Sequence, residues 1–161
     1  MGQKTNPRAL RIGISDDSDS VWFDDREYGA KILEDFSIRN FLQKEFKVAA
    51  VSKICIFRKA DQIEVNVHSA RAGVIFAKNS IDIDVITEQL NHRIKNKVVI
   101  NIIENKKPDL TATLLAEWIS AQIVKRVPFR RVLKMAIQKS LKSGAKGVKV
   151  CLSGRLGGAE I

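Results

Sequence analysis

The sequence predicts an α+β fold in two parts, and three observations lead to this prediction. Hydrophobic periodicities typical of helices and strands occur in the order helix, strand, strand, helix, turn, helix, strand over the first hundred residues. A charged segment containing Pro108 follows at residues 105–109 and interrupts the pattern. Hydrophobic residues make up 45% of the 161-residue chain, which is enough for packed cores.

The first 25 residues combine glycine, proline and an acidic cluster, which is typical of an extended, turn-rich arm. Apolar residues then recur at helical spacing over residues 26–47, and we expect a long helix there. The apolar and aromatic stripe of this helix is expected to lie in the core; it consists of Tyr28, Ile32, Leu33, Phe36, Phe41, Leu42 and Phe46.

Strands are predicted at residues 53–58 and 62–68, which are joined by a connection short enough for a hairpin. A short helix is expected at residues 70–76 and a second helix at residues 81–95, with an interruption at 77–80. The apolar run at residues 98–103 predicts a buried strand.

Two helices are predicted beyond the linker, at residues 111–126 and 129–142. Pro128 has no amide hydrogen to donate and biases Val127 away from helix, so a corner is expected between these helices. The alternation of apolar and polar residues over 147–153 predicts one further strand.

The charge of the chain is concentrated near its C-terminus. The formal net charge is +10; residues 1–50 contribute −1, residues 51–104 contribute +2 and residues 105–161 contribute +9. This excess favours a polyanionic partner over a merely solvated lysine-rich surface. No apolar run of about 18 residues occurs, and residues 1–14 lack a secretory signal pattern, so we expect neither a membrane span nor secretion.

The helix predicted at 129–142 separates its charge from its apolar side. Val132, Leu133, Ala136, Ile137 and Leu141 fall on one half of the helix. The other half carries Arg130, Arg131, Lys134, Gln138, Lys139 and Lys142, without an acidic residue. A membrane surface is the alternative partner, but only Phe129 could act as an aromatic anchor, so RNA is favoured.

Nothing in the sequence predicts a catalytic or metal site, and we expect no enzyme activity, cofactor or metal. His68 and His92 do not form a metal-binding spacing with Cys55 or Cys151, which we expect to be buried, reduced thiols. The glycine-rich segment at 154–158 follows a strand but opens no helix, so it is weak as a nucleotide-binding loop.

The interruption between the two middle helices occupies the position of a KH-type RNA-binding turn. A KH module places a glycine-bounded turn between two helices, after strands, and the turn clamps the nucleic-acid backbone. Here the turn consists of Ala77, Lys78, Asn79 and Ser80, so both glycines are replaced and close phosphate approach is restricted. A helix–turn–helix retained for packing alone is the competing interpretation.

Four segments, spread from the start of the chain to its end, resemble one family. They are the start MGQKTNP, residues 126–134 (RVPFRRVLK), and residues 144–147 (GAKG) with 153–161 (SGRLGGAEI). The sequence is similar to the bacterial-type small-subunit ribosomal protein S-three family, whose N-terminal half is a type II KH domain. The resemblance implies an arm at 1–25, a KH domain (α-β-β-α-α-β) at 26–106, and at 107–161 a second α+β domain with two helices and an incomplete sheet.

The resemblance also implies partners and site residues. The partners are small-subunit rRNA, mRNA and neighbouring proteins of the small-subunit head. Arg130, Arg131 and Lys134 are expected to line the channel by which mRNA enters, and to support unwinding of structured message. The expected rRNA-binding residues are Gln3, Lys4, Asn6, Arg8, Arg71, Lys78, Lys106, Lys107, Arg126, Lys146 and Arg155.

The family continues beyond the equivalent of Ile161 with strands that complete the C-terminal sheet. We therefore expect the strand at 147–153 to present an open edge. Either the chain was trimmed, or a second polypeptide or rRNA covers this edge. The expected location is the ribosome of a bacterial cytoplasm or an organelle such as the mitochondrial matrix. A free KH-type RNA-binding regulator and a nucleic-acid lyase using a lysine are the alternative functions.

Overall fold

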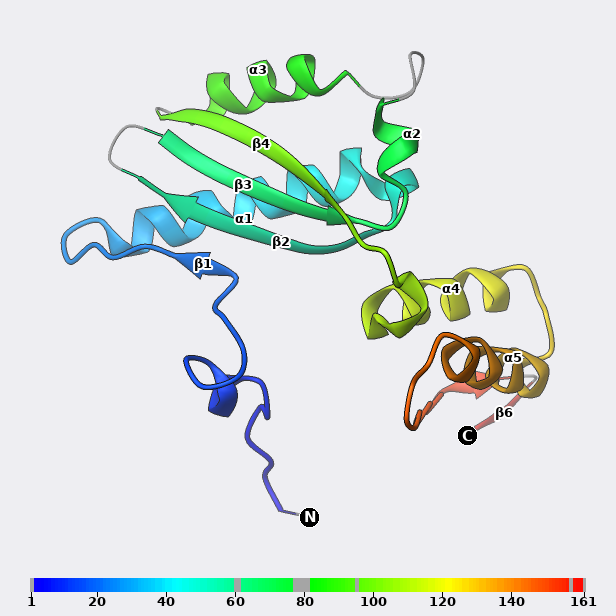
Figure 1. Ribbon diagram of the computed structural model, residues 1–161. Helices are drawn as coiled ribbons and strands as arrows, with labels where there is room; N and C mark the ends of the chain where they lie inside the picture. The colour runs from blue at the N-terminus through cyan, green and yellow to red at the C-terminus, as the bar shows by residue number, and fades with distance from the viewer. Residues whose placement is uncertain (1, 60–61, 77–81, 95, 157, 161) are drawn as a thin grey trace. The chain divides into compact units, whose positions relative to one another are not determined.

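The computed structural model describes residues 2–59, 62–76, 82–94, 96–156 and 158–160. The chain divides into two compact units, residues 1–104 and residues 105–161, and each is described by itself. Among the described residues, the first unit contains a four-stranded sheet with three α-helices, and the second contains two α-helices and a short hairpin (Figure 1). The architecture is therefore mixed α+β, as the order of periodicities predicts.

The sheet of the first unit has the strand order β1-β2-β3-β4. Its strands are β1 (Ser20–Val21), β2 (Val51–Arg58), β3 (Gln62–Ser69) and β4 (Lys97–Glu104). β2 and β3 pair antiparallel, whereas β1 runs parallel to β2 and β4 runs parallel to β3. The hairpin and the last strand match the predicted segments, while β1 lies inside the expected arm and its pairing was not predicted.

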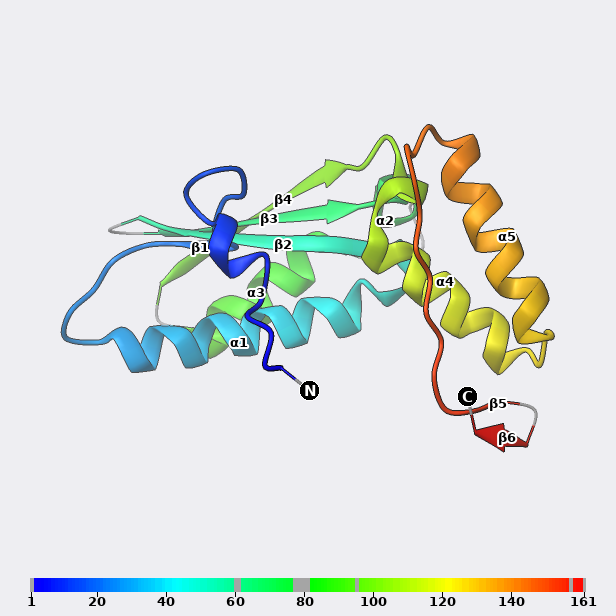
Figure 2. The same ribbon diagram turned by 90° about the horizontal axis from the view of Figure 1, so that it is seen from below.

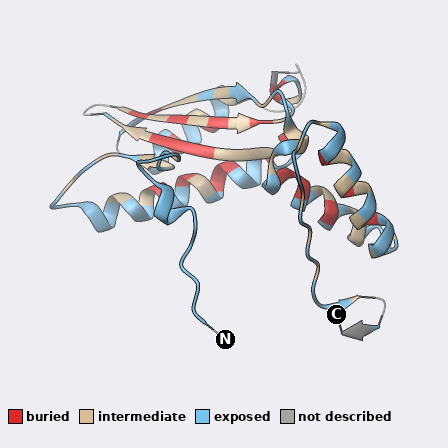
Figure 3. Ribbon diagram, turned by 60° about the horizontal axis from the view of Figure 1, so that its bottom comes forward, coloured by how far each residue is buried: buried red, intermediate tan, exposed pale blue. Residues whose placement is uncertain are grey.

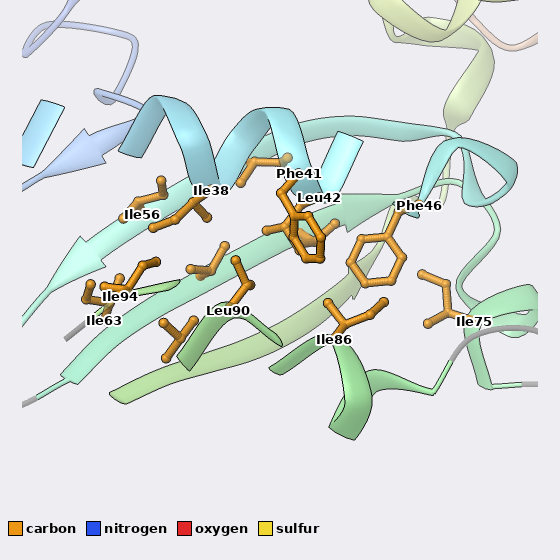
Figure 4. Close-up of a cluster of buried hydrophobic side chains, with 14 of the residues drawn as sticks. Ile38, Phe41, Leu42, Phe46, Ile56, Ile63, Ile75, Ile86, Leu90 and Ile94 are labelled. Atoms are coloured by element: carbon orange, nitrogen blue, oxygen red, sulfur yellow. The ribbon is translucent and has the colours of Figure 1, made fainter. Parts of the chain in front are cut away.

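Helices α1 (Tyr28–Glu45) and α3 (Ile83–Arg93) cover one face of this sheet, and the short α2 (Ala72–Phe76) precedes α3 (Figure 2). Along β3, Ile63, Val65 and Val67 alternate with partly exposed polar residues, so one face of the strand is buried against the helices. They pack with residues of α1 and α3 such as Leu42 and Leu90 (Figure 4). Burial of each such side chain contributes about 1.5–3 kcal/mol to folding.

The apolar stripe of α1 is only half in the core, which corrects the prediction. Phe41, Leu42 and Phe46 are buried, but Tyr28, Ile32, Leu33 and Phe36 are 58%, 41%, 70% and 64% exposed. The first turns of α1 are largely exposed, and its buried positions begin near the middle of the helix (Figure 3). The reason is helical phase. The buried face at Ile38, Phe41 and Leu42 continues three and four residues earlier at Glu34 and Asp35, so polar side chains occupy the inward positions there.

β4 is an edge strand rather than the fully buried strand predicted from its apolar run. Val98 is buried and Ile100 and Ile102 are partly buried against the helices, whereas Asn101 and Ile103 are exposed on the opposite face. A strand with a helix layer on one face only keeps a solvated side, and its apolar composition does not reveal this.

The second unit is built on α4 (Ala112–Val124) and α5 (Phe129–Lys142), preceded by a 3₁₀ turn at Pro108–Leu110. Leu115, Ile119, Val132 and Ala136 form its buried cluster. The corner lies at the predicted place: Pro128 precedes α5, and its carbonyl accepts hydrogen bonds from the amides of Arg131 and Val132 in the first turn of that helix. α4 ends two residues earlier than predicted, since Arg126 adopts a left-handed conformation with φ of 58°.

The predicted strand at 147–153 is wrong as secondary structure. Val148, Val150 and Leu152 are half-buried and alternate with exposed Lys149 and Cys151, but the segment pairs with no strand in the described part of the unit. Alternation makes a segment suitable for a sheet, while a strand needs a neighbour to bond its amides. Short strands β5 (Arg155–Leu156) and β6 (Ala159–Glu160) form a separate hairpin.

The cysteines also differ from the prediction. Cys55 lies in β2 and is buried, as expected, whereas Cys151 is exposed. Cys151 falls on the outward phase of the 147–153 segment, because its neighbours Val150 and Leu152 are the side chains that pack against the cluster of the second unit. A buried position for Cys151 would have required a sheet neighbour on that side.

Candidate nucleic-acid interface

The basic side of α5 is the most concentrated cationic surface that one element of the second unit presents. Arg130, Arg131 and Lys134 are all exposed on this helix. Val132 and Ala136 are fully buried on the opposite side and hold the helix in place. A rigid helix backed by a packed core therefore positions three cations, with Arg130 also lying 5.8 Å from the ring centre of Phe129.

The N-terminal end of α5 adds to this positive potential. Its first turn contains no acidic residue, and Arg130 and Arg131 follow directly after Phe129. The amides at a helix N-terminus carry a partial positive charge that favours phosphate. Arg126 is exposed in the preceding corner, and its left-handed backbone turns the chain from α4 toward α5. The cations and the helix dipole thus have the same sign at one end of α5.

The helical projection places Lys139 on the basic face with the other cations, but in the structure its ammonium group is held by an acidic residue. Its Nζ lies 2.8 Å from Oδ1 of Asp109 and 5.3 Å from the ring centre of Trp118. Asp109 also accepts hydrogen bonds from Ser143 Oγ at its side chain (3.3 Å) and from Ser140 Oγ at its backbone carbonyl (3.1 Å). An acidic residue from the 3₁₀ turn therefore neutralises one end of the basic face, and Lys139 fastens α5 to that turn.

In the N-terminal arm, Arg8 is similarly occupied. Its guanidinium donates two hydrogen bonds to the carboxylate of Asp19, at 2.9 and 2.5 Å, and Lys53 Nζ lies 3.2 Å from the same carboxylate. Burial acts to raise the pKa of Asp19, but the hydrogen bonds from Arg8 and Lys53 outweigh it and the pKa lies below its usual value. The hydrogen bond to Asp19 likewise raises the pKa of Arg8.

The remaining expected RNA contacts are distributed over both units. Gln3, Lys4 and Asn6 are exposed in the arm, and Arg71 is exposed between β3 and α2. In the second unit, Lys106, Lys107, Lys146 and Arg155 are exposed. The KH-type turn, which comprises Ala77, Lys78, Asn79 and Ser80, lies outside the described residues.

One polar cluster of the first unit was missed by the sequence reasoning. Asp35 is 3% exposed, and its carboxylate accepts hydrogen bonds from Arg58 of β2 and from Ser20 and Trp22 of the arm. The signal was present, because Glu34 and Asp35 share the helical phase of Ile38 and Leu42. Acidic residues on the inward face of an amphipathic helix indicate buried polar partners.

The described residues contain no group of three or more His, Cys, Asp or Glu side chains that could hold a metal ion. Within the same residues, no helix is long and apolar enough to cross a membrane.

Two family models match the chain: "KH domain" over residues 37–110 and "Ribosomal protein S3, C-terminal domain" over residues 119–161. KH domains bind RNA, so the fold and the basic helix together define a KH-type RNA-binding protein. The small ribosomal subunit protein uS3 of Anaplasma phagocytophilum (strain HZ) is 51% identical over 161 residues, which cover the whole chain and 76% of that protein. The chain belongs to the small ribosomal subunit protein uS3 family.

Other members show the same relationship. The uS3 protein of Ehrlichia canis (strain Jake) is 51% identical over 161 residues, again covering 100% of this chain and 76% of that protein. The uS3 protein of Wolbachia sp. subsp. Brugia malayi (strain TRS) is 44% identical over 162 residues and is covered to 79%. The family resemblance expected from the sequence motifs is confirmed. The chain is a non-enzymatic ribosomal protein with a KH RNA-binding domain, and it serves translation.

Proposed function

We propose that this protein binds small-subunit rRNA in the head of the small ribosomal subunit and that Arg130, Arg131 and Lys134 line the channel by which mRNA enters. The observation that carries the proposal is the geometry of α5. Three exposed cations share a helix with the buried Val132 and Ala136. Contacts to phosphates supply affinity without reading sequence, which is what a channel for every message requires.

The same geometry explains how the protein could support unwinding without a nucleotide site. Arginine guanidinium groups grip phosphates bidentately, and lysine adds charge that follows the backbone. Held on a rigid helix, these groups would retain one strand of a duplex while the translating ribosome pulls the other. The energy comes from translocation, so Arg130 and Arg131 act by position alone.

The test is the double variant Arg130→Ala with Arg131→Ala, expressed in cells and recovered in ribosomes. We expect normal assembly into small subunits and slower translation of messages with a stable hairpin, compared with unstructured messages. Lys44→Ala with Lys47→Ala is the matched control, since it removes two exposed cations from the first unit. Loss of assembly in the first variant alone would assign these arginines to rRNA rather than mRNA.

For rRNA, we propose contacts from the arm through Gln3, Lys4 and Asn6, and from the exposed cations Arg71, Lys106, Lys107, Arg126, Lys146 and Arg155. Arg8 is the least favoured of the expected set, because Asp19 already holds its guanidinium. Each lost phosphate contact should reduce the slope of log affinity against log salt by about 0.7–0.9. A Lys4→Ala variant should show such a change in the slope, and Arg8→Ala should not. Equal changes in both variants would mean that Arg8 also contacts rRNA phosphate.

The turn at residues 77–80 is proposed as a weakened KH clamp in which Lys78 supplies the cation. Support comes from the KH match, which spans the turn, and from the replacement of both glycines. Ala77→Gly with Ser80→Gly should raise affinity for single-stranded RNA, because glycine permits closer approach of the phosphate. Lys78→Ala should lower it. Unchanged affinity in both variants would leave the turn a packing element.

We also propose that residues 26–106 act as the KH domain and residues 107–161 as the C-terminal domain. A further strand, from a second chain or a longer form of the protein, would complete the sheet of the C-terminal domain. An apolar groove of about 660 Å³ lies between α4 and the 147–152 segment, lined by Ile119, Ile123 and Val150 among others. This chain covers 76% of the length of the Anaplasma phagocytophilum relative. Appending the residues of that relative that follow its equivalent of Ile161 should slow amide exchange at residues 147–153; unchanged exchange would refute strand addition.

A further inference from the structure

The carboxylate of Asp35 is shared between two parts of the first unit. Its Oδ1 accepts hydrogen bonds from Nε and Nη2 of Arg58, at 2.9 and 2.6 Å. Its Oδ2 accepts hydrogen bonds from Ser20 Oγ at 2.9 Å and from Trp22 Nε1 at 2.8 Å. One oxygen therefore faces β2, and the other faces the segment that leads in from the N-terminal arm.

A second layer extends these bonds into the arm. Arg39, one helical turn after Asp35, donates to Ser20 Oγ (2.6 Å) and to the backbone carbonyl of Asp19 (2.9 Å). The side chain of Asp19 in turn binds Arg8 and Lys53. Two sets of hydrogen bonds, joined through the residue Asp19, thus link the buried Asp35 to Arg8 across the segment that connects the arm to the sheet.

The hydrogen bonds between Asp35 and the arm matter energetically because Asp35 is 3% exposed and the Arg58 side chain is 7% exposed. A buried carboxylate oxygen without a donor is costly, so Oδ2 must be covered by the arm or reached by water. In the described residues, every buried side-chain nitrogen and oxygen has a hydrogen-bond partner. Docking of the arm therefore satisfies a buried charge that the helix and sheet hold in place.

We infer that Asp35 is a positioning residue that orders the segment from Arg8 to Trp22 on the sheet before any RNA is bound. β1 has only the two residues Ser20 and Val21, which is too short to hold the arm by itself. We call the hydrogen bonds of Asp35 with Ser20 and Trp22 the clamp. The clamp fixes the base of the arm, from which Gln3 and Lys4 extend. Ordering the base of the arm in advance lowers the entropy lost when its tip binds. In this last respect the inference rests on the proposed contact between arm and rRNA.

The test removes the donors of the arm and keeps the Asp35–Arg58 pair. In the full chain, Ser20→Ala with Trp22→Phe deletes both bonds to Oδ2. The reporter is the amide of Ile56, which donates to the carbonyl of Asp19 at 2.9 Å and should lose protection when the arm is released. We expect hydrogen exchange at Ile56 to accelerate at least tenfold, while the amides between β3 and β4 exchange as before.

Ser37→Ala is the matched control, because Ser37 lies on α1 and its hydroxyl donates a hydrogen bond within that helix, to the carbonyl of Glu34. It should leave exchange at Ile56 unchanged. Wild-type protection of Ile56 in the Ser20→Ala, Trp22→Phe variant would overturn the inference, since the arm would then be held without Asp35. Faster exchange at all amides would also overturn it, because Asp35 would then stabilise the whole unit rather than position the arm.

Binding of a small-subunit rRNA transcript separates this inference from the proposed function. If both hold, the Ser20→Ala, Trp22→Phe variant binds more weakly, and adding Lys4→Ala costs less affinity than it does in the wild type. If Ile56 exchanges faster but affinity is unchanged, the clamp stands and the arm is not an RNA contact. If Ile56 stays protected, the clamp fails whatever the affinity shows.

Discussion

Lys139 and Asp109 form an ion pair of 2.8 Å that joins α5 to the 3₁₀ turn preceding α4. The pair removes one cation from a helix face that the sequence presents as uniformly basic. It also separates the cations by role, since Arg130, Arg131 and Lys134 point to solvent while Lys139 secures the helix that carries them.

Asp109→Ala should therefore lower the stability of the second unit without altering the exposed cations. Because both side chains are partly exposed, at 40% and 29%, we expect a loss of about 1 kcal/mol. Thermal unfolding followed by circular dichroism measures it. Glu117→Ala, which removes an exposed acidic residue of α4, is the control, and an equal loss in both variants would contradict a specific role for Asp109.

The buried pair of Asp35 and Arg58 predicts a larger effect. Asp35→Ala leaves Arg58 with one partly exposed carboxylate partner, Glu34, and should lower the free energy of unfolding, measured by urea denaturation, by about 3–5 kcal/mol. Adding Arg58→Met should recover much of this loss, because the uncompensated buried charge is removed. If the double variant is less stable than Asp35→Ala alone, Arg58 stabilises the fold through its other contacts.

Burial on α1 predicts opposite results for two leucines. Leu42 is fully buried and Leu33 is 70% exposed, although both belong to the same apolar stripe. Leu42→Ala should cost about 2–5 kcal/mol because it leaves a cavity, whereas Leu33→Ala should change stability by about 0.5 kcal/mol or less. Chemical denaturation of both variants measures the two changes in the free energy of unfolding. A large loss of stability in Leu33→Ala would place the first half of the stripe in the core.

Asp24 predicts a pH dependence at the start of α1. Hydrogen bonds from the amides of Glu27 and Arg26 and from Lys31 lower the pKa of Asp24 from 3.8 to about 2. A lowered pKa means that its contribution is complete above pH 3.8 and is lost as the pH falls toward 2. Carboxyl NMR titration should find a midpoint near 2 that rises in Lys31→Met; a midpoint at 3.8 would show that these bonds are absent in solution.

Local patterns were sufficient for most of the elements. The periodicity of 129–142 predicted α5 to the residue, and Pro128 predicted the corner before it, because both effects act within one or two helical turns. β2, β3, α3 and β4 were located to within a few residues for the same reason. The charge distribution indicated the class of partner, and four short motifs were sufficient for the family.

Tertiary structure decided everything that depends on a neighbour distant in sequence. The segment at 147–153 alternates like a strand, but an ordered strand requires a second one to bond it, and alternation cannot supply that. The phase of α1 relative to the sheet, not its composition, determined that Asp35 is buried while Phe36 is exposed. In the basic third, the sequence determined the sum of the charges on α5. Only packing decided which of them Asp109 holds and which remain exposed, because an ion pair depends on distance in space.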